Sequence, residues 1–350
     1  MALSDGDASK HRRKRKLYHA LMSGEETKVF ELCKRIPEGP LHIVSIHKDT
    51  VLHMATYSKL QDLVLKLLEK LPENESHKLT HQNDRGNTIL HQAATSNLLV
   101  PAAQQMLGRA PELLSMGNFN GEIATFRAAR YGKNEMFWFL DGQVDNIRVR
   151  EGRDVYRKVF YQRTDGTTVL HISVLTEHFG LALSIAKKYE FLVSKRDGDN
   201  MTALQLLACN SSAFEYGCFS RLFKRLFDCF EPRRRRTLWG TIQNQKEKHE
   251  LAMELAEFLI ERDISWEDTD PVVDEGKPKI HKYGEASTAS EGQGKKIAET
   301  PLFLATKSGC KEIVEAILKR YPQAIEHIDH EGRNILHVAI MYRQIRIFDK

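Results

Sequence analysis

The chain has 350 residues, of which 41% are hydrophobic and 28% charged, and its 52 basic and 47 acidic residues leave a formal net charge of +5. These values are ordinary for a folded protein, and so small a net charge argues against a general binder of polyanions. The five cysteines are widely spaced and form no C-x-x-C pair, so neither a disulfide framework nor a zinc site is indicated and a reducing, intracellular compartment is expected.

The first segment, residues 1–16, is polar and then basic, and we expect it to be disordered. Its basic run consists of Arg12, Arg13, Lys14, Arg15 and Lys16. No apolar stretch follows the run, so it does not have the pattern of a secretory signal. No stretch of the chain reaches the roughly 18 apolar residues that a membrane helix needs. A cytoplasmic location is therefore expected.

A short pattern recurs from residue 17 onward. Four copies end in Leu-His, and four others place a different residue at the same position; the series is Tyr18, His53, His91, Phe126, His171, Gln205, Phe303 and His337. Most of these positions are about 34 residues apart, which is the spacing of a repeat architecture. One modest and one large insertion interrupt the series.

Each copy predicts a tight turn followed by two helices. In segments such as 83–86 and 118–121, an Asn or Asp is followed three positions later by a glycine, which indicates a tight turn. Glycine permits the positive φ that such a turn needs, and Asn200 is a tolerable substitute for it. The threonine that follows is a natural N-cap for the first helix, which Gly132 and Gly309 can end. The second helix carries apolar residues at helical spacing, as in 313–318.

The recurring histidines are interpreted as structural. One histidine in each repeat, always at the same position, cannot converge with the others on a single metal ion. We expect each imidazole to bridge backbone groups of adjacent repeats.

A period of about 33 residues with the pattern T-P-L-H-x-A is typical of ankyrin repeats. The best copy reads Thr300, Pro301, Leu302, Phe303, Leu304, Ala305. The sequence outside 209–298 therefore resembles ankyrin-repeat proteins. The resemblance implies an all-α solenoid of helix pairs with short β-turn loops: repeats 1–6 begin within 17–208, and repeats 7–8 occupy 299–350. Because a solenoid normally ends in a polar capping repeat, we expect the natural chain to continue beyond Lys350.

Residues 209–298 are predicted to be an insert with two amphipathic helices and a disordered acidic and polar loop. The apolar residues of 218–230 are expected to supply the second helix of the sixth repeat, and 241–262 to form the other helix. A second basic run, Arg233, Arg234, Arg235 and Arg236, lies between them. The composition of 268–296, rich in Gly, Ser, Glu, Lys and Asp, predicts the disordered loop.

No catalytic motif is found. The signatures of zinc proteases, EF-hands and serine hydrolases are absent, and Gly292, Gly294 and Lys295 lack the spacing of a phosphate loop. We expect no enzymatic activity, no cofactor, no metal and no small-molecule substrate.

The resemblance to ankyrin proteins implies a concave surface, made of turn tips and the inner face of the first helices, that binds a protein partner. The candidate residues at these positions are Asp84, Arg85, Asn87, Phe119, Asn120, Arg130, Tyr131, Thr164, Asp165, His330, Glu331, Arg333 and Tyr342. Phe119, Tyr131 and Tyr342 are the expected anchors, because aromatic side chains are enriched among binding hot spots. The sequence departs from the pattern where Lys48, Glu177 and Arg343 replace glycines.

The order of parts resembles plant ankyrin proteins that carry a C-terminal PGG-type membrane domain, on the basis of the irregular early repeats and the segments 246–249, 299–303 and 321–329. That resemblance implies the cytosolic part of a membrane-associated protein of stress or defence signalling, with the membrane domain beyond Lys350. The alternative is a nuclear regulator or nucleic-acid-associated protein that uses the basic runs 12–16 and 233–236. Solvated helix flanks are the third explanation of these runs.

Overall fold

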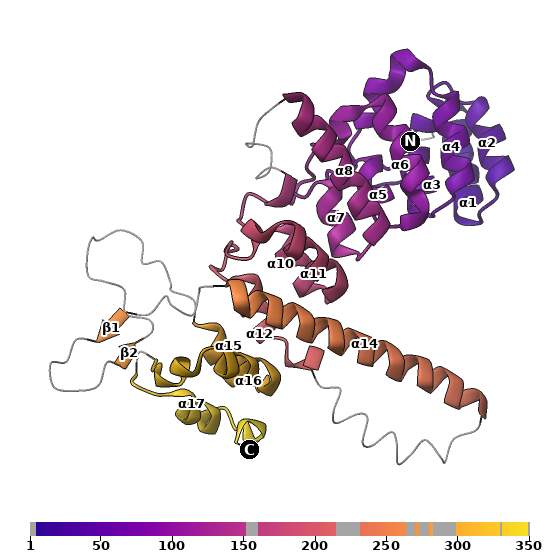
Figure 1. Cartoon of the computed structure of the whole chain (residues 1–350). Coiled ribbons are helices and arrows are strands. Elements are labelled where there is room, and N and C mark those ends of the chain that lie inside the picture. The colour runs from indigo at the N-terminus through magenta and orange to yellow at the C-terminus, as the bar shows by residue number, and fades with distance from the viewer. Residues whose placement is uncertain are drawn as a thin grey trace. The chain divides into compact units, whose positions relative to one another are not determined.

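The structure is a computed structural model that describes residues 5–151, 160–214, 232–263, 270–272, 280–282, 299–329 and 331–348. The described residues are predominantly helical, so the expected all-α class is confirmed at that level (Figure 1). Their only strands are β1 (Asp270–Val272) and β2 (Ile280–Lys282), a short antiparallel pair. The chain divides into an N-terminal unit, Met1–Thr164, and a C-terminal unit, Asp165–Lys350.

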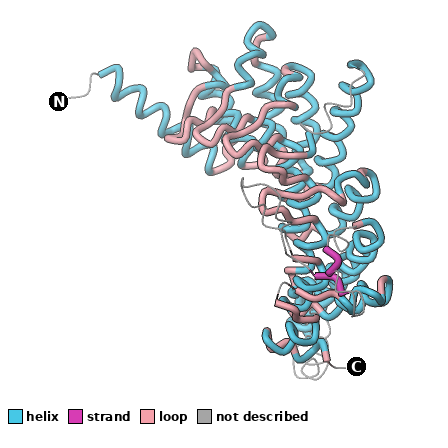
Figure 2. Tube along the Cα trace, turned by 90° about the vertical axis from the view of Figure 1, so that its left-hand side faces the viewer, coloured by secondary structure: helices cyan, strands magenta, loops and turns pink. Residues whose placement is uncertain are grey.

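The described part of the N-terminal unit is built from successive helix pairs. They are α1 (Asp5–Met22) with α2 (Glu26–Lys34), α3 (Val51–Tyr57) with α4 (Gln61–Lys70), α5 (Ile89–Ala93) with α6 (Val100–Arg109), and α7 (Ala124–Arg130) with α8 (Asn134–Glu151). The first helix of each pair packs on the first helix of the next, and the second helices pack on one another in the same order. Short 3-10 helices join the elements: η1 (Gly39–Leu41), η2 (Glu73–Thr80), η3 (Asn97–Leu99) and η4 (Pro111–Leu114). The connecting loops of this unit gather on one side of the helices (Figure 2).

Helix α1 corrects the expectation of a disordered N-terminus. It begins at Asp5 and includes the whole basic run 12–16. The last turns of the helix are packed in the core through the buried side chains Leu17, Ala20 and Leu21. Because no glycine or proline occurs in 7–23, the helix extends from this packed end toward the N-terminus through strong helix formers. Its N-terminal part projects from the rest of the unit (Figure 2), where Arg12, Arg13, Arg15 and Lys16 are exposed and Lys14 is half-buried.

The C-terminal unit is also built from paired helices. Its described pairs are α10 (Val169–Leu175) with α11 (Phe179–Lys188), α12 (Ala203–Ala208) with α14 (Pro232–Arg262), and α15 (Pro301–Ser308) with α16 (Lys311–Arg320), followed by α17 (Ile335–Met341). The 3-10 helices of this unit are η5 (Glu190–Leu192), η6 (Ser211–Phe214), η9 (Pro322–Glu326) and η10 (Ile345–Ile347). Helix α12 lies between α10 and α15, which in turn packs on α17.

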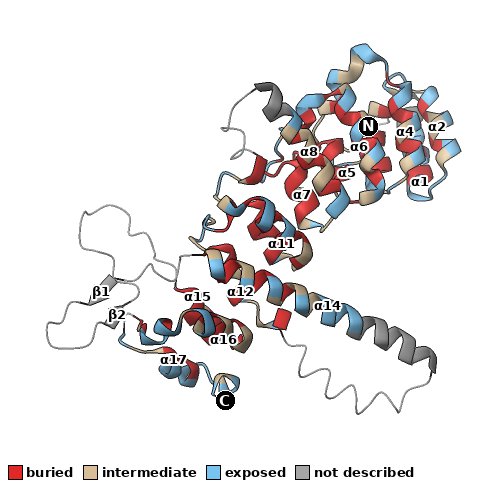
Figure 3. Ribbon diagram, viewed as in Figure 1, coloured by how far each residue is buried: buried red, intermediate tan, exposed pale blue. Residues whose placement is uncertain are grey.

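Helix α14 packs beside α12, between the second helices α11 and α16. It packs against both α11 and α16, and the buried side chains of its C-terminal half are Ala252, Leu255, Ala256, Leu259 and Ile260 (Figure 3). Ion pairs hold it on both sides, from Lys187 to Glu254 at 2.8 Å and from Arg320 to Glu261 at 2.9 Å. The helix predicted over 241–262 therefore begins earlier, at Pro232, and contains the run 233–236. The segment 218–230 lies outside the described residues.

The predicted loop 268–296 differs from the structure at two places. The strands β1 and β2 fall within it, where composition gave no indication of strands, since each is only three residues long. The rest of that loop lies outside the described residues. The modest insertion before the fifth repeat is accounted for in part by α8, which has 18 residues where α4, α6 and α11 each have 10.

The predicted turn and cap positions are confirmed. The hydroxyls of Thr50, Thr168, Thr202 and Thr300 each accept the backbone N–H three residues on. Gly132 and Gly309 adopt the left-handed conformation that ends a first helix, and Asn200 does so in its turn. Lys48, Glu177 and Arg343 have φ values of 61°, 61° and 56°. These residues therefore adopt the same left-handed conformation as the glycines at the corresponding positions of the other copies.

Candidate interaction surface

The turn tips of the N-terminal unit are joined to one another by hydrogen bonds. The Asp84 N–H donates to the His47 carbonyl at 2.9 Å, and the Phe119 N–H donates to the Arg85 carbonyl at 3.2 Å. Beneath them, the Asn118 amide donates to the Asn87 side-chain oxygen at 3.0 Å. Since the backbone and the first side chain of each turn are fixed in this way, the side chains at the tips project from a rigid row.

Two buried histidines, His53 and His91, join successive first helices in the way expected. His91 Nε2 donates to the Glu122 carbonyl at 2.8 Å, while its Nδ1 accepts the Thr88 N–H at 3.1 Å. His53 makes the corresponding bond to the Asn87 carbonyl at 3.1 Å. A carbonyl oxygen only accepts hydrogen bonds, so Nε2 carries a proton in both rings, and the Thr88 N–H that donates to Nδ1 shows that the His91 imidazole is neutral. Burial lowers the pKa of His53 and of His91 to about 4.

Two other residues at the histidine position show what the bridge requires. Gln205 reproduces it with an amide: its Oε1 accepts the Thr202 N–H at 2.7 Å and its Nε2 donates to the Glu299 carbonyl at 2.7 Å. His337 is exposed, and its Nδ1 accepts only the Asn334 N–H within its own turn. His53 and His91 are therefore occupied by structural hydrogen bonds, whereas Nε2 of the buried His171 makes no such bond.

Phe119 and Tyr131 are the predicted anchors that the N-terminal unit presents to solvent. The Phe119 side chain is 74% exposed at its turn tip, and its backbone and ring lie so close to Gly86 that a Cβ atom there would approach them within 3 Å. Tyr131 is 44% exposed just after α7, with the Arg127 guanidinium 5.4 Å from its ring centroid. Both aromatic rings are thus exposed but locally fixed.

The polar candidates of the same unit have different environments. Arg85, Asn120 and Thr164 are exposed, and Asp84 is exposed with an ion pair to Lys48 at 3.2 Å. Asn87 is buried, which corrects its assignment as a binding residue. It occupies the last position of its turn, where its side chain faces the next repeat and accepts from Asn118 and, at 3.4 Å, from Arg127.

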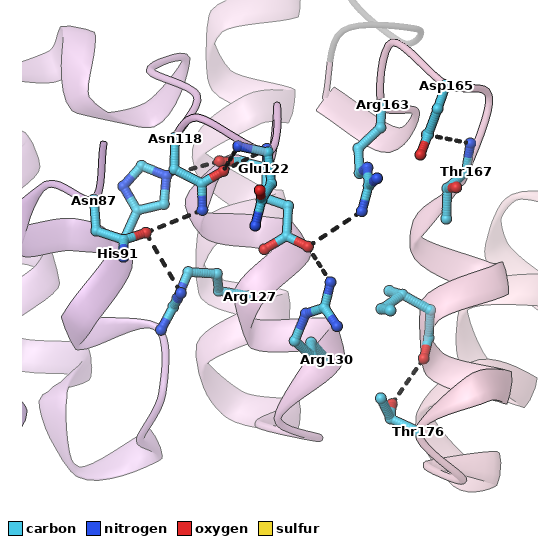
Figure 4. A network of polar contacts seen from close by, with 12 residues as sticks. Asn87, His91, Asn118, Glu122, Arg127, Arg130, Arg163, Asp165, Thr167 and Thr176 are labelled. Carbon is cyan, nitrogen blue, oxygen red and sulfur yellow. Dashed lines mark hydrogen bonds and ion pairs between the residues drawn. The ribbon is translucent and has the colours of Figure 1, made fainter. Parts of the chain in front are cut away.

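A network of arginines around one carboxylate lies beside these residues (Figure 4). Glu122, the last residue of its turn, is only 2% exposed, and its Oε1 pairs with Arg130 and, at 3.4 Å, with Arg163. Arg127 points from α7 toward Asn87. Arg130, a predicted binding residue, is therefore half-buried and already paired. The network escaped the sequence analysis because Arg163 is distant from Glu122 along the chain.

The C-terminal unit holds the remaining predicted residues. Asp165 is exposed, and its carboxylate accepts the N–H of Thr167 at 3.0 Å within the same turn. Arg333 is half-buried between Asp329, at 2.7 Å, and Glu331, so both carboxylates neutralise it. Tyr342 is exposed, with Lys307 Nζ 5.4 Å from its ring centroid. His330 lies outside the described residues.

Two exposed apolar residues of the second repeat were missed by the sequence analysis. Ile46 is 87% exposed at the turn-tip position that Asp84 and Phe119 occupy in later repeats, and Tyr57, at the end of α3, is 62% exposed. Aligning the repeats on His53 would have identified both residues. Tyr57 lies four positions after His53, just as the predicted binding residue Arg130 lies four positions after Phe126. The side chains of the basic run 233–236 lie outside the described residues.

Other chemistry receives no support from the described part of the chain. It contains no group of three or more His, Cys, Asp or Glu side chains placed to hold a metal ion. Burial raises the pKa of the Cys33 and Cys310 thiols to about 12, so neither is a thiolate at neutral pH. A search of the described helices for one long and apolar enough to cross a bilayer finds none.

Comparison of the sequence with models of known protein families finds no match. Comparison with curated proteins finds no significant similarity either.

Proposed function

We propose that this chain is an ankyrin-repeat solenoid that binds a protein partner through its turn tips and the adjacent face of its first helices. The helix pairs, the threonine caps, the left-handed positions and the His or Gln bridges between first helices all support the repeat assignment. In such a stack every repeat completes the core of its neighbour, which leaves the turns available for recognition.

The observation that carries the binding function is the exposure of large aromatic side chains on a fixed backbone. Phe119 and Tyr131 lie on a turn row and a first helix that hydrogen bonds hold in place. Aromatic anchors that are rigid before binding lose little conformational entropy on association, so they favour specific protein contacts. Ile46 and Tyr57 add apolar surface at the corresponding positions of the second repeat.

The biological setting we propose is the cytosolic side of a membrane-associated signalling protein of the stress or defence type. It is supported by the resemblance of the sequence to plant ankyrin proteins with a C-terminal membrane domain. The described residues would then form the partner-binding part of that protein.

The binding function is tested by selecting protein fragments from an unbiased display library against the full chain. The selected fragments are then measured against a Phe119→Ala/Tyr131→Ala double variant and against Lys66→Ala, which changes an exposed residue of the second helix α4. We expect the double variant to weaken binding by about 100-fold, since two hot-spot residues are lost, and Lys66→Ala to leave it unchanged. Fragments that bind both variants as well as the unaltered chain would refute the proposed surface.

A further inference from the structure

Helix α1 carries most of the net charge of the chain. With histidine neutral, its six lysines and arginines and its two aspartates leave it with a net charge of +4, compared with +5 for all 350 residues. Five of these cations are consecutive: Arg12, Arg13, Lys14, Arg15 and Lys16. Among the described residues, no carboxylate forms an ion pair with any of the five. Glu25, which follows the helix, is paired with Lys28 at 2.8 Å.

This concentration of one charge weakens the helix that contains it. Residues three or four positions apart are neighbours on a helix surface, and like charges in such pairs, as in Arg12 with Lys16, are destabilising. A flank that serves only solubility gains nothing from excluding acidic residues, which would remove this cost. The run is therefore better explained by an anionic partner than by solvation alone.

The side of α1 that faces away from the core carries both cations and apolar groups. The core-facing side consists of Leu17, Ala20 and Leu21. The opposite side, which we call the exposed face of α1, consists of exposed residues spaced by three or four positions: Arg12, Arg15, His19 and Met22. Met22 is 54% exposed, and Tyr18, at the edge of this face, is 38% exposed. The exposed face therefore changes from cationic to apolar along the helix.

We propose that the exposed face of α1 binds the surface of an anionic lipid membrane. The cations pair with the phosphate and carboxylate groups of the lipid headgroups, and each one strengthens binding about fivefold. Met22 and Tyr18 enter the boundary between headgroups and acyl chains, where tyrosine is enriched and apolar side chains leave water. The inference goes beyond the proposed protein-binding surface and does not depend on it.

The composition of the exposed face favours a membrane over a nucleic acid. A nucleic-acid site is a track of cations that follows the phosphates, whereas this face carries no lysine or arginine after Lys16 and ends in Met22. A phosphate backbone gains nothing from an exposed thioether, but a lipid interface accepts cationic and apolar groups together. The rest of the chain adds almost no net charge with which to extend such a track.

The test is co-sedimentation of the full chain with phosphatidylcholine vesicles that contain roughly one third phosphatidylserine. We expect binding that weakens as salt rises from about 0.1 M to about 1 M, and no comparable binding to phosphatidylcholine alone. The Arg12→Gln/Arg15→Gln variant, which retains good helix formers, should bind about 25-fold more weakly. The matched control, Lys66→Gln/Lys70→Gln, removes two exposed cations from α4 and should bind as the unaltered chain does. Equal losses from the two variants would overturn the proposal, as would equal binding to both kinds of vesicle.

A further variant, Met22→Ser, tests the apolar part of the exposed face. It should weaken vesicle binding about threefold without changing its salt dependence. A short DNA duplex, measured in parallel, should bind more weakly than the anionic vesicles. The proposal is wrong if Met22→Ser leaves vesicle binding unchanged, or if the duplex binds more tightly than the vesicles and is lost with Arg12→Gln/Arg15→Gln. Failure of the protein-binding surface leaves these vesicle results unaffected, so the two proposals are tested separately.

Discussion

Acid sensitivity of the two buried histidines gives the sharpest prediction about the repeat itself. His53 and His91 are neutral in the folded chain with a pKa of about 4, whereas an unfolded histidine has a pKa of about 6.5. The unfolded state therefore binds protons that the folded state excludes. The stabilising contribution is complete above pH 6.5 and is lost as the pH falls from there toward 4.

The size of the effect follows from the two pKa values. Lowering the pH from 7.5 to 4.5 should cost about 2.5 kcal/mol of folding free energy for each of these histidines. Carboxylates also titrate in this range, so the histidine contribution has to be isolated by substitution. Gln205 shows that glutamine makes the same bridge, with bonds of 2.7 Å on both sides, and glutamine does not titrate.

The assay is denaturant unfolding, followed by circular dichroism, of the unaltered chain and of the His91→Gln variant at both pH values. At pH 7.5 we expect the variant to lie within about 1 kcal/mol of the unaltered chain, because the bridge is preserved. When the pH is lowered from 7.5 to 4.5, the free energy of unfolding of the variant should fall by about 2.5 kcal/mol less than that of the unaltered chain. The matched control is His337→Gln, at the same repeat position but exposed and without the bridge, which should leave the free energy of unfolding at pH 7.5 nearly unchanged. Equal acid sensitivity of the His91→Gln variant and the unaltered chain would refute the reasoning.

The remaining predictions concern helix α14 and the turn row. Leu255→Ala should destabilise the chain by about 3 kcal/mol, because it opens a cavity where α14 packs on its neighbours, whereas the exposed Glu257→Ala should have little effect in the same denaturation measurement. Gly86→Ala should lower the free energy of unfolding by about 3 kcal/mol, since the added Cβ would collide with the Phe119 backbone. Gly24 also has a positive φ but has open space around it, so Gly24→Ala should lower the free energy of unfolding by only about 1 kcal/mol. Equal costs for the two glycines would show that the contact with Phe119 is unimportant.

The sequence was informative where structure is determined locally. Threonine caps, turn glycines and the apolar spacing of the second helices each depend on residues within a few positions, so the helix pairs and the role of His91 were predictable. Even where Lys48 stands in place of the turn glycine, the backbone has the positive φ, 61°, that glycine adopts in the other turns.

The sequence failed where distant residues meet. The sequence of 232–262 does not indicate that α14 packs beside α11. An amphipathic helix can pack on any apolar surface, so its pattern alone does not identify its neighbours. Likewise the burial of Asn87 and Glu122 depends on Asn118, Arg130 and Arg163 from neighbouring turns. Its position in the turn predicted that Asn87 is exposed, but its side chain is buried because it accepts a hydrogen bond from Asn118 of the next turn.

The most direct test of the central claim is a hydrogen-exchange footprint of a selected protein fragment bound to the full chain, followed by mass spectrometry. We expect slower exchange on binding in the turn segments 45–49, 83–87 and 118–122 and at the end of α7, with α4 and α6 unchanged. Protection confined to the second helices α4 and α6, with the turns exchanging as in the free chain, would contradict it.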